Sequence, residues 1–208
     1  MRLLLINPNS SQATTDMMVA MAGFGVTGIT ATGAPPMITT AEALDAAAAE
    51  VVQIGLREAP GHDAVIVAAF GDPGVAELRA AGLRVVGICE AAMRNAAEGG
   101  RRFAVATTTP GLVARIDAKA AALGWSAQYA GCWLTPGDPL ALSADPELLR
   151  EALAKAVAAA ISEGKAEAVI IGGGPLSAAA AALEKRFAVP VIAPVAAAVA
   201  ECINPTNP

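Results

Sequence analysis

The sequence predicts an α/β protein built from parallel sheets that are covered by helices. Short apolar runs alternate along the chain with longer alanine-rich segments of helical periodicity. Most of the apolar runs end at Gly, Pro, Asn or Thr, which is typical of buried strands that lead into turns. Hydrophobic residues make up 55% of the 208 residues but aromatic residues only 3%, so the predicted core consists of Ala, Val, Ile and Leu.

Eight of the apolar runs are predicted to be strands. Their residues are 3–6, 26–31, 64–69, 85–88, 103–106, 126–130, 168–171 and 190–192. The clearest helices are 40–59 and 145–163. Thr39 or Thr40 can cap the first of them, and Pro146 suits the first turn of the second, which Gly164 ends.

The chain also contains an internal repeat. The segment AVIVAAFGDPGV from Ala64 aligns without a gap with AVIIGGGPLSAA from Ala168, and RLLLIN at Arg2 aligns with RFAVAT at Arg102. We therefore predict two similar lobes, residues 1–98 and 99–193, with the first completed by a C-terminal helix at 194–208. Ligands of open parallel sheets bind beyond the carboxyl ends of the strands, so two facing lobes would place four strand-end turns around one cleft.

Charge and hydropathy exclude two classes of partner. Fourteen Lys and Arg against nineteen Asp and Glu give a net charge of -5, and no basic run is present, so nucleic acid is not an expected partner. The longest uncharged stretch, between Asp16 and Glu42, is interrupted by glycines and prolines and cannot span a membrane as one helix. Arg2 leads directly into the first predicted strand, so we expect no signal peptide and a cytoplasmic protein.

The cysteine and histidine content makes a metal site or a disulfide framework unexpected. Cys89, Cys132 and Cys202 are unevenly spaced without a CxxC pair, and His62 is the single histidine. Cys132 and Cys202 are predicted to be packing residues, and His62 lies at the strand end opposite the cleft.

Four turns are predicted to face the cleft, each ending a strand and opening a helix. Small residues, hydroxyls, amides and glycines there expose backbone N–H groups at the positive end of a helix, where a carboxylate or another small anion is favoured. Any one turn is also an ordinary cap, and none carries a nucleotide-binding fingerprint. The turns are residues 7–11, 69–74, 107–110 and 172–177.

The motifs in these turns resemble one family. INPNSS after the first strand, AAFGDPG after the third, TTTP at Thr107 and the GGGPL turn are together similar to the aspartate/glutamate/hydantoin racemase superfamily, most closely its hydantoin racemase branch. The resemblance implies two pseudo-symmetric Rossmann-like or flavodoxin-like lobes with a cofactor-free site between them. It also implies racemisation or epimerisation at a carbon next to a carbonyl. We expect the substrate to be held, and an enolate-like intermediate stabilised, by Asn7, Ser11, Phe70, Thr107, Thr108, Gly174 and Pro175.

The sequence departs from this family at the positions that transfer protons. The family's chemistry needs an acid/base group on each face of the chiral carbon, and in most members both groups are cysteines. The matching positions here are Ala69 and Gly173, so the two-thiol mechanism is not available. Asp72 is the predicted substitute base, although it could simply shape its turn, and Cys89 with its neighbour Glu90 is the weaker alternative.

Three hypotheses follow. The first is an isomerase acting on a small amino-acid derivative, hydantoin-like or carboxylate, by proton transfer at its chiral carbon. The second is a family member that has lost or altered its catalysis and binds a small carboxylate. The third is an engineered form of a thiol enzyme with replaced cysteines. In each case the alanine-rich composition and the 16% of charged residues predict a homo-oligomer.

Overall fold

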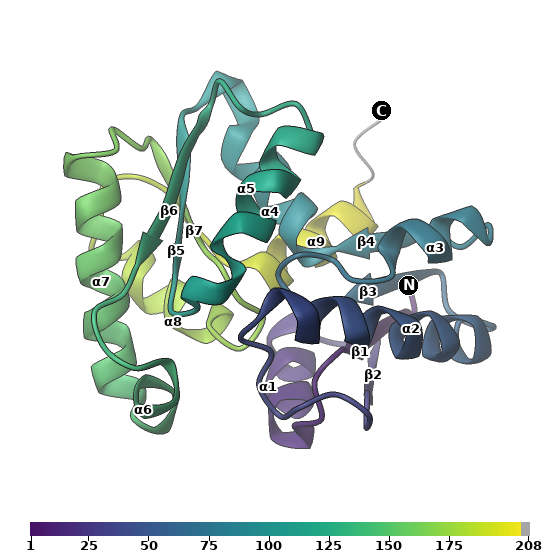
Figure 1. Cartoon of the computed structure of the whole chain (residues 1–208). Coiled ribbons are helices and arrows are strands. Elements are labelled where there is room, and N and C mark those ends of the chain that lie inside the picture. The colour runs from purple at the N-terminus through teal and green to yellow at the C-terminus, as the bar shows by residue number, and fades with distance from the viewer. Residues whose placement is uncertain (205–208) are drawn as a thin grey trace.

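A computed structural model describes residues 1–204 and contains two four-stranded parallel sheets (Figure 1). The first sheet has the order β2-β1-β3-β4 and the second the order β6-β5-β7-β8, so both follow the same path. Parallel neighbours that are distant in sequence require helical crossovers, which the alanine-rich segments supply. The predicted α/β fold of two parallel-sheet lobes is confirmed.

The strands lie close to the predicted apolar runs. They are β1 (Leu3–Asn7), β2 (Val26–Thr30), β3 (Ala64–Val67), β4 (Val85–Gly87), β5 (Phe103–Thr107), β6 (Tyr129–Leu134), β7 (Ala168–Ile171) and β8 (Val191–Ile192).

The sixth strand was predicted at the wrong place, because it starts at Tyr129 rather than at residue 126. The carbonyl of Trp125 accepts hydrogen bonds from the backbone N–H groups of Gln128 and Tyr129, at 3.0 and 2.9 Å, and this closes a turn. The Trp125 ring packs edge-on against Phe103, with 6.1 Å between ring centroids. Residues 126–128 are Ser, Ala and Gln, which favour strands less than the aromatic and β-branched residues do, so this segment forms the turn and the strand begins at Tyr129.

The two sheets have equivalent hydrogen bonds just before their central strands. The backbone N–H of Arg2 donates to the Asp63 carboxylate at 2.6 Å, and the Asp63 N–H donates to the Arg2 carbonyl at 2.7 Å. In the second lobe Arg102 and Glu167 make the same pair of bonds, at 2.8 and 2.7 Å. The repeat seen in the sequence is thus a repeat of register between the central strands, β1 with β3 and β5 with β7, whereas β5 and β6 pair with a register shift that β1 and β2 lack.

Helices connect the strands and cover the sheets. None of those within residues 1–204 combines the length and apolar character that a membrane crossing requires. Thr40 and Asp145 cap α2 and α7 with their side chains, close to the predicted starts. The helices are α1 (Gln12–Ala22), α2 (Ala41–Glu58), α3 (Val75–Ala80), α4 (Ile88–Ala97), α5 (Val113–Ala122), α6 (Pro139–Ala144), α7 (Pro146–Ser162), α8 (Ser177–Glu184) and α9 (Pro194–Ile203), with 3-10 turns η1 (Glu98–Gly100) and η2 (Pro110–Leu112).

The two helices that follow the last strand of each lobe are exchanged. Helix α4 leaves the first sheet but packs on the second, where Met93 shares a core with Phe103. Helix α9 leaves the second sheet and packs on the first, where Val195 shares a core with Leu5, and α4 and α9 lie against each other (Figure 1). Residues 205–208 of the predicted C-terminal helix lie outside the described residues, and the predicted lobe boundaries stay a prediction.

Candidate functional site

One cavity of about 620 Å³ lies where the carboxyl ends of both sheets meet. The turn after β3 contributes Ala69 and the turn after β7 contributes Gly173, which are the two positions that the internal repeat aligns. Helices α1, α6, α7 and α8 and the loop before α2 complete the walls. The structure therefore brings the two equivalent strand ends to one shared space.

Five of the seven predicted substrate-binding residues line this cavity. They are Ser11, Phe70, Thr108, Gly174 and Pro175.

Asn7 and Thr107 do not line the cavity, contrary to expectation, because their side chains are used within the protein. The Asn7 amide is buried and donates to Asn9 Oδ1 and Thr15 Oγ1, at 2.9 and 3.0 Å. Thr107 holds the equivalent position in the second lobe, and its Oγ1 donates to the Gly172 carbonyl at 2.9 Å. Both residues hold the strand-end turns in place.

Asp72 was expected to border the cleft as a base, but it is not among the residues that line the cavity. Its carboxylate is buried beneath the turn and accepts the N–H groups of Cys89 and Glu90, at 2.8 and 3.0 Å, so it caps the start of α4. Its backbone has a φ of 56°, a left-handed conformation that Asp tolerates better than most residues. These two hydrogen bonds at the N-terminus of α4 hold the Asp72 carboxylate inside the protein, so it does not face the cavity.

A buried cluster of charges surrounds Asp72. Lys119 of α5 approaches it with 3.0 Å between Nζ and Oδ2 and lies 3.7 Å from Glu90, which also pairs with Arg79. Burial raises the pKa of Asp72 to about 6, with Lys119 opposing the rise and Glu90 adding to it. Burial works against the charge of Lys119 as well, but Asp72 and Glu90 together raise its pKa. The cluster joins the first lobe to α5 of the second.

No cysteine or histidine of the described chain lines the cavity. Burial and the neighbouring Asp72 raise the pKa of the Cys89 thiol well above its usual value. Burial raises the pKa of Cys132 to about 12 and that of Cys202 to about 11. His62 lies with Nδ1 3.0 Å from the Glu58 carbonyl oxygen, after α2 and outside the cavity. The thiols of Cys89, Cys132 and Cys202 are therefore packing groups rather than nucleophiles.

The cavity offers hydrogen-bond donors instead. Within residues 1–204, the backbone N–H groups of Thr108, Thr109 and Gly174 have no acceptor. Ser11 Oγ accepts from Thr14 N–H and Thr14 Oγ1, at 3.3 and 3.0 Å, which leaves its own proton free to donate. Such donors at helix starts suit carbonyl, carboxylate or enolate oxygens.

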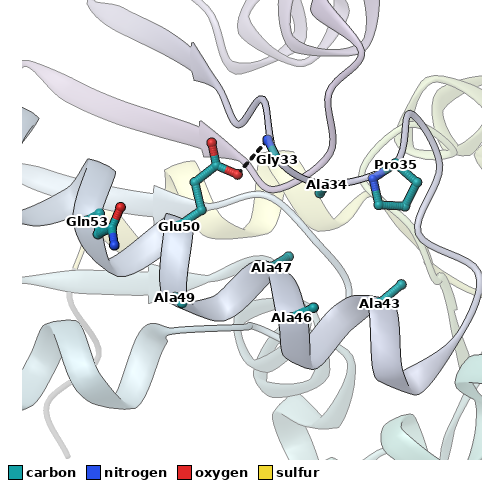
Figure 2. A pocket seen from close by; sticks show the side chains of 9 residues that line it. All are labelled: Gly33, Ala34, Pro35, Ala43, Ala46, Ala47, Ala49, Glu50 and Gln53. Carbon is teal, nitrogen blue, oxygen red and sulfur yellow. Dashed lines mark hydrogen bonds between the residues drawn. The ribbon is translucent and has the colours of Figure 1, made fainter.

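A smaller hollow of about 380 Å³ lies between α2 and the loop that follows β2 (Figure 2). Among the described residues that line it, Glu50 alone is charged, and it accepts the N–H groups of Thr32 and Gly33, at 2.7 and 2.9 Å. The bond from Thr32, opposed by slight burial and helped by Gly33, lowers the pKa of Glu50. The same loop continues into residues 36–38 of the main cavity, so Glu50 anchors a cavity wall.

Sequence reasoning missed the part of the cavity that α6 and α7 contribute. Leu140, Leu149 and Arg150 line it, yet they occupy ordinary positions in helical segments with nothing in the pattern to mark them. Thr109, in contrast, belongs to a turn that the sequence did single out. Only the docking of α6 and α7 over the strand ends brings the first three residues to the site.

Comparison with known proteins identifies the family. The sequence profile described as Asp/Glu/hydantoin racemase matches residues 3–202. The chain belongs to this family. A hydantoin racemase from Rhizobium meliloti is 33% identical over 207 residues, which cover 96% of this chain and 86% of that protein. The resemblance inferred from the turn motifs is thereby confirmed, and the protein is an isomerase of the racemase type.

Solved structures of the family support the same assignment. An allantoin racemase from Klebsiella pneumoniae superposes with a TM-score of 0.87 at 30% identity, covering 98% of this chain and 86% of that one. An allantoin racemase from Pseudomonas fluorescens gives a TM-score of 0.88 at 27% identity, covering 98% and 89%. The racemase family fold therefore extends over nearly the whole chain.

Proposed function

We propose that this protein binds a small hydantoin-like cyclic amide or a related carboxylate between its lobes and exchanges the proton on its chiral carbon. The observation that carries the proposal is that Ala69 and Gly173, equivalent strand-end positions of the two lobes, line one cavity. Relatives named hydantoin racemase and allantoin racemase supply the ligand class.

The donors of the cavity would hold the ligand's oxygens. The free N–H groups of Thr108 and Gly174 and the hydroxyl of Ser11 belong to elements that meet at the cavity. When the proton leaves the chiral carbon, its electron pair moves into the adjacent carbonyl and forms an enolate oxygen. Each well-placed donor on such an oxygen is worth about 10²–10³ in rate. The substrate's own carbonyl takes up the electrons, so we propose that no cofactor takes part.

Solvent would carry the proton, because the positions flanking the cavity lack a base. Of the described residues that line it, Arg150 alone has an ionisable side chain, and an arginine stays protonated. Hydroxide removes the proton and becomes water; water then returns a proton to either face, and hydroxide is regenerated. The rate of such a reaction rises about tenfold for each pH unit.

A second candidate function is binding without catalysis. It is favoured by the methyl group of Ala69 and the hydrogen of Gly173, which cannot transfer protons, and by the inward-turned carboxylate of Asp72. In this case the cavity would capture a small amide or carboxylate and release it unchanged.

Hydrogen exchange in heavy water separates the two candidates. Single enantiomers of 5-methylhydantoin and allantoin are incubated with the protein, exchange is followed by NMR against a protein-free blank, and calorimetry measures binding. Exchange above the blank, with a logarithmic rate that rises by about one per pH unit, is the expected result. Binding without exchange identifies the second candidate, and the absence of binding overturns both.

We also propose a homo-oligomer in the cytoplasm. Three exposed leucines, Leu134, Leu140 and Leu148, lie in or near α6 and α7, which supports association through this region. The three cysteines are free thiols, which suits a reducing compartment. Light scattering that gives the mass of a single chain at micromolar concentration would reject the oligomer.

A further inference from the structure

The two walls of the cavity differ in chemistry. The wall made by the strand-end turns presents backbone donors and the hydroxyl of Thr108. The part of the wall that α6, α7 and α8 contribute is mainly aliphatic and includes Leu140, Leu149 and Ala179. One cation interrupts this aliphatic part, the guanidinium of Arg150 on α7.

Arg150 is placed to receive an anion. It lies just beyond the first turn of α7, where its side chain reaches the cavity wall. Its one hydrogen bond within residues 1–204 goes from Nη2 to Glu147, which does not line the cavity. Since a guanidinium has five N–H donors, most remain available, and 37% of the side chain is exposed.

The nearby carboxylates of Glu151 and Asp145 already have other partners and do not pair with Arg150. Glu151, the next carboxylate on α7, pairs with Arg186, and the Asp145 carboxylate already accepts two backbone N–H groups as the helix cap. No acidic side chain is among the described residues of the cavity wall. A carboxylate that enters would therefore compete for the guanidinium with Glu147, an exposed partner that does not line the cavity.

We propose that Arg150 selects substrates whose chiral-carbon substituent ends in a carboxylate, that is, hydantoins derived from acidic amino acids. The inference rests on the proposed function: the ring occupies the donors of the strand-end wall while the substituent extends along the aliphatic wall to the guanidinium. The carboxylate binds bidentately, in the fork geometry that arginine offers.

Two ligands of nearly equal size test the proposal by calorimetry, 5-(2-carboxyethyl)hydantoin and its neutral analogue 5-(2-carbamoylethyl)hydantoin. The carboxylate is expected to bind at least tenfold more tightly to the unchanged protein. In Arg150→Gln the ratio of the two affinities should fall to about one, and in Arg150→Lys, which keeps the charge without the fork, to an intermediate value. Thermal unfolding establishes that each variant is folded.

Glu147→Gln is the matched control, since it changes the neighbouring surface charge and releases the guanidinium. Its affinity ratio should equal or exceed that of the unchanged protein. Equal affinities for both ligands in the unchanged protein, or a ratio that Glu147→Gln lowers as much as Arg150→Gln does, would overturn the proposal. If 5-methylhydantoin or allantoin binds but neither substituted hydantoin does, or the neutral one binds as well as the acid, only the role of Arg150 fails; if none of the four ligands binds, the proposed function itself fails.

Discussion

The central strand pairs of the two lobes, β1 with β3 and β5 with β7, start alike, but the turns that follow them differ. Both use the same strand order, and both join their central strands through a backbone-to-carboxylate bond, at Arg2 and at Arg102. The turn after β3 then buries the charge of Asp72 under the cavity, whereas the turn after β7 is neutral, with Gly173 and Gly174 at the cavity surface. Sheet register tolerates little change, but strand-end turns can diverge, and with them the chemistry of the site.

Each turn is held by a different kind of bond. In the first lobe, the added Cβ of any larger residue at Gly87 would lie 2.3 Å from Asp72 Cγ, so the capping carboxylate needs this glycine. In the second lobe, the hydroxyl of Thr107 holds the carbonyl of Gly172. An ionic network therefore supports one half of the cavity and a neutral hydrogen bond supports the other.

The largest effect is expected from giving both turns the same chemistry, through the double change Ala69→Cys and Gly173→Cys. Ala69 already carries a Cβ, and a Cβ at Gly173 would lie 3.0 Å from Leu176 Cγ, which a small shift of that side chain relieves. Two thiols facing one cavity should increase hydantoin proton exchange by about 10²–10⁴, the usual contribution of acid/base groups. NMR exchange rates in heavy water measure the gain.

The control for this change is the corresponding double serine variant, which adds similar volume without an acidic proton. A cysteine variant that still binds hydantoin but exchanges it no faster than the serine variant would contradict the placement of these residues on both faces of a ligand.

The second-largest effect is expected from Lys119→Met, which removes the cation that pairs with Asp72 in the turn after β3. Removing the cation leaves Asp72 and Glu90 buried with less compensation, which should lower the free energy of unfolding by about 2 kcal/mol at pH 7.5. The pKa of Asp72 is raised to about 6, so the folded state binds this proton more readily than the unfolded state. Stability from this group therefore increases as the pH falls through 6, and the penalty should shrink at pH 5.

Urea unfolding at both pH values measures this change. The exposed Lys185 provides the control Lys185→Met, which should alter stability little at either pH. A penalty for Lys119→Met that is the same at pH 7.5 and pH 5 would show that Asp72 does not titrate in this range.

A smaller effect is the difference in stability expected between alanine substitutions at two neighbouring glycines in the turn after β7. A Cβ at Gly172 would lie 2.5 Å from Val105 Cγ1 in the core, so Gly172→Ala should cost about 1–3 kcal/mol of stability. Gly173→Ala should cost less than about 1 kcal/mol, because its neighbour Leu176 is only half-buried. The first lobe carries Ala68 at the position equivalent to Gly172. Equal losses in thermal or urea unfolding would contradict this difference.

The smallest effect concerns the loop before α2. Glu50→Gln replaces a carboxylate that accepts two backbone N–H groups, so the loop that carries Met37 and Ile38 should be held less firmly. We expect ligand affinity to fall about two- to fivefold, less than the loss of a whole hydrogen bond to a charged group would cost, because the neutral amide can still accept one of the N–H groups. Calorimetry with a neutral hydantoin measures it. Glu77→Gln on the exposed face of α3 is the control, and an equal change in both variants would exclude a role of the loop anchor.

Much of the fold could be predicted because its signals are local. Apolar runs bounded by turn residues located most strands, and Thr40 and Asp145 mark helix starts that the structure confirms. The sixth strand was misplaced because residues 126–128 form a turn closed by hydrogen bonds to the Trp125 carbonyl, and this turn delays the start of the strand to Tyr129. A C-terminal helix that completes the first lobe was expected, but nothing in the sequence indicated that α4 packs on the second sheet, which depends on the apolar faces that meet there.

The candidate site likewise has features that the sequence predicted and features that it did not. The repeat alone paired Ala69 with Gly173, because both residues follow strands that align between the two halves of the chain. The sequence did not predict that the Asp72 carboxylate points into the protein or that Arg150 lines the cavity. Both depend on which surfaces meet when α4, α5 and α7 dock, and the free energy of that docking is summed over many distant contacts that no short motif contains.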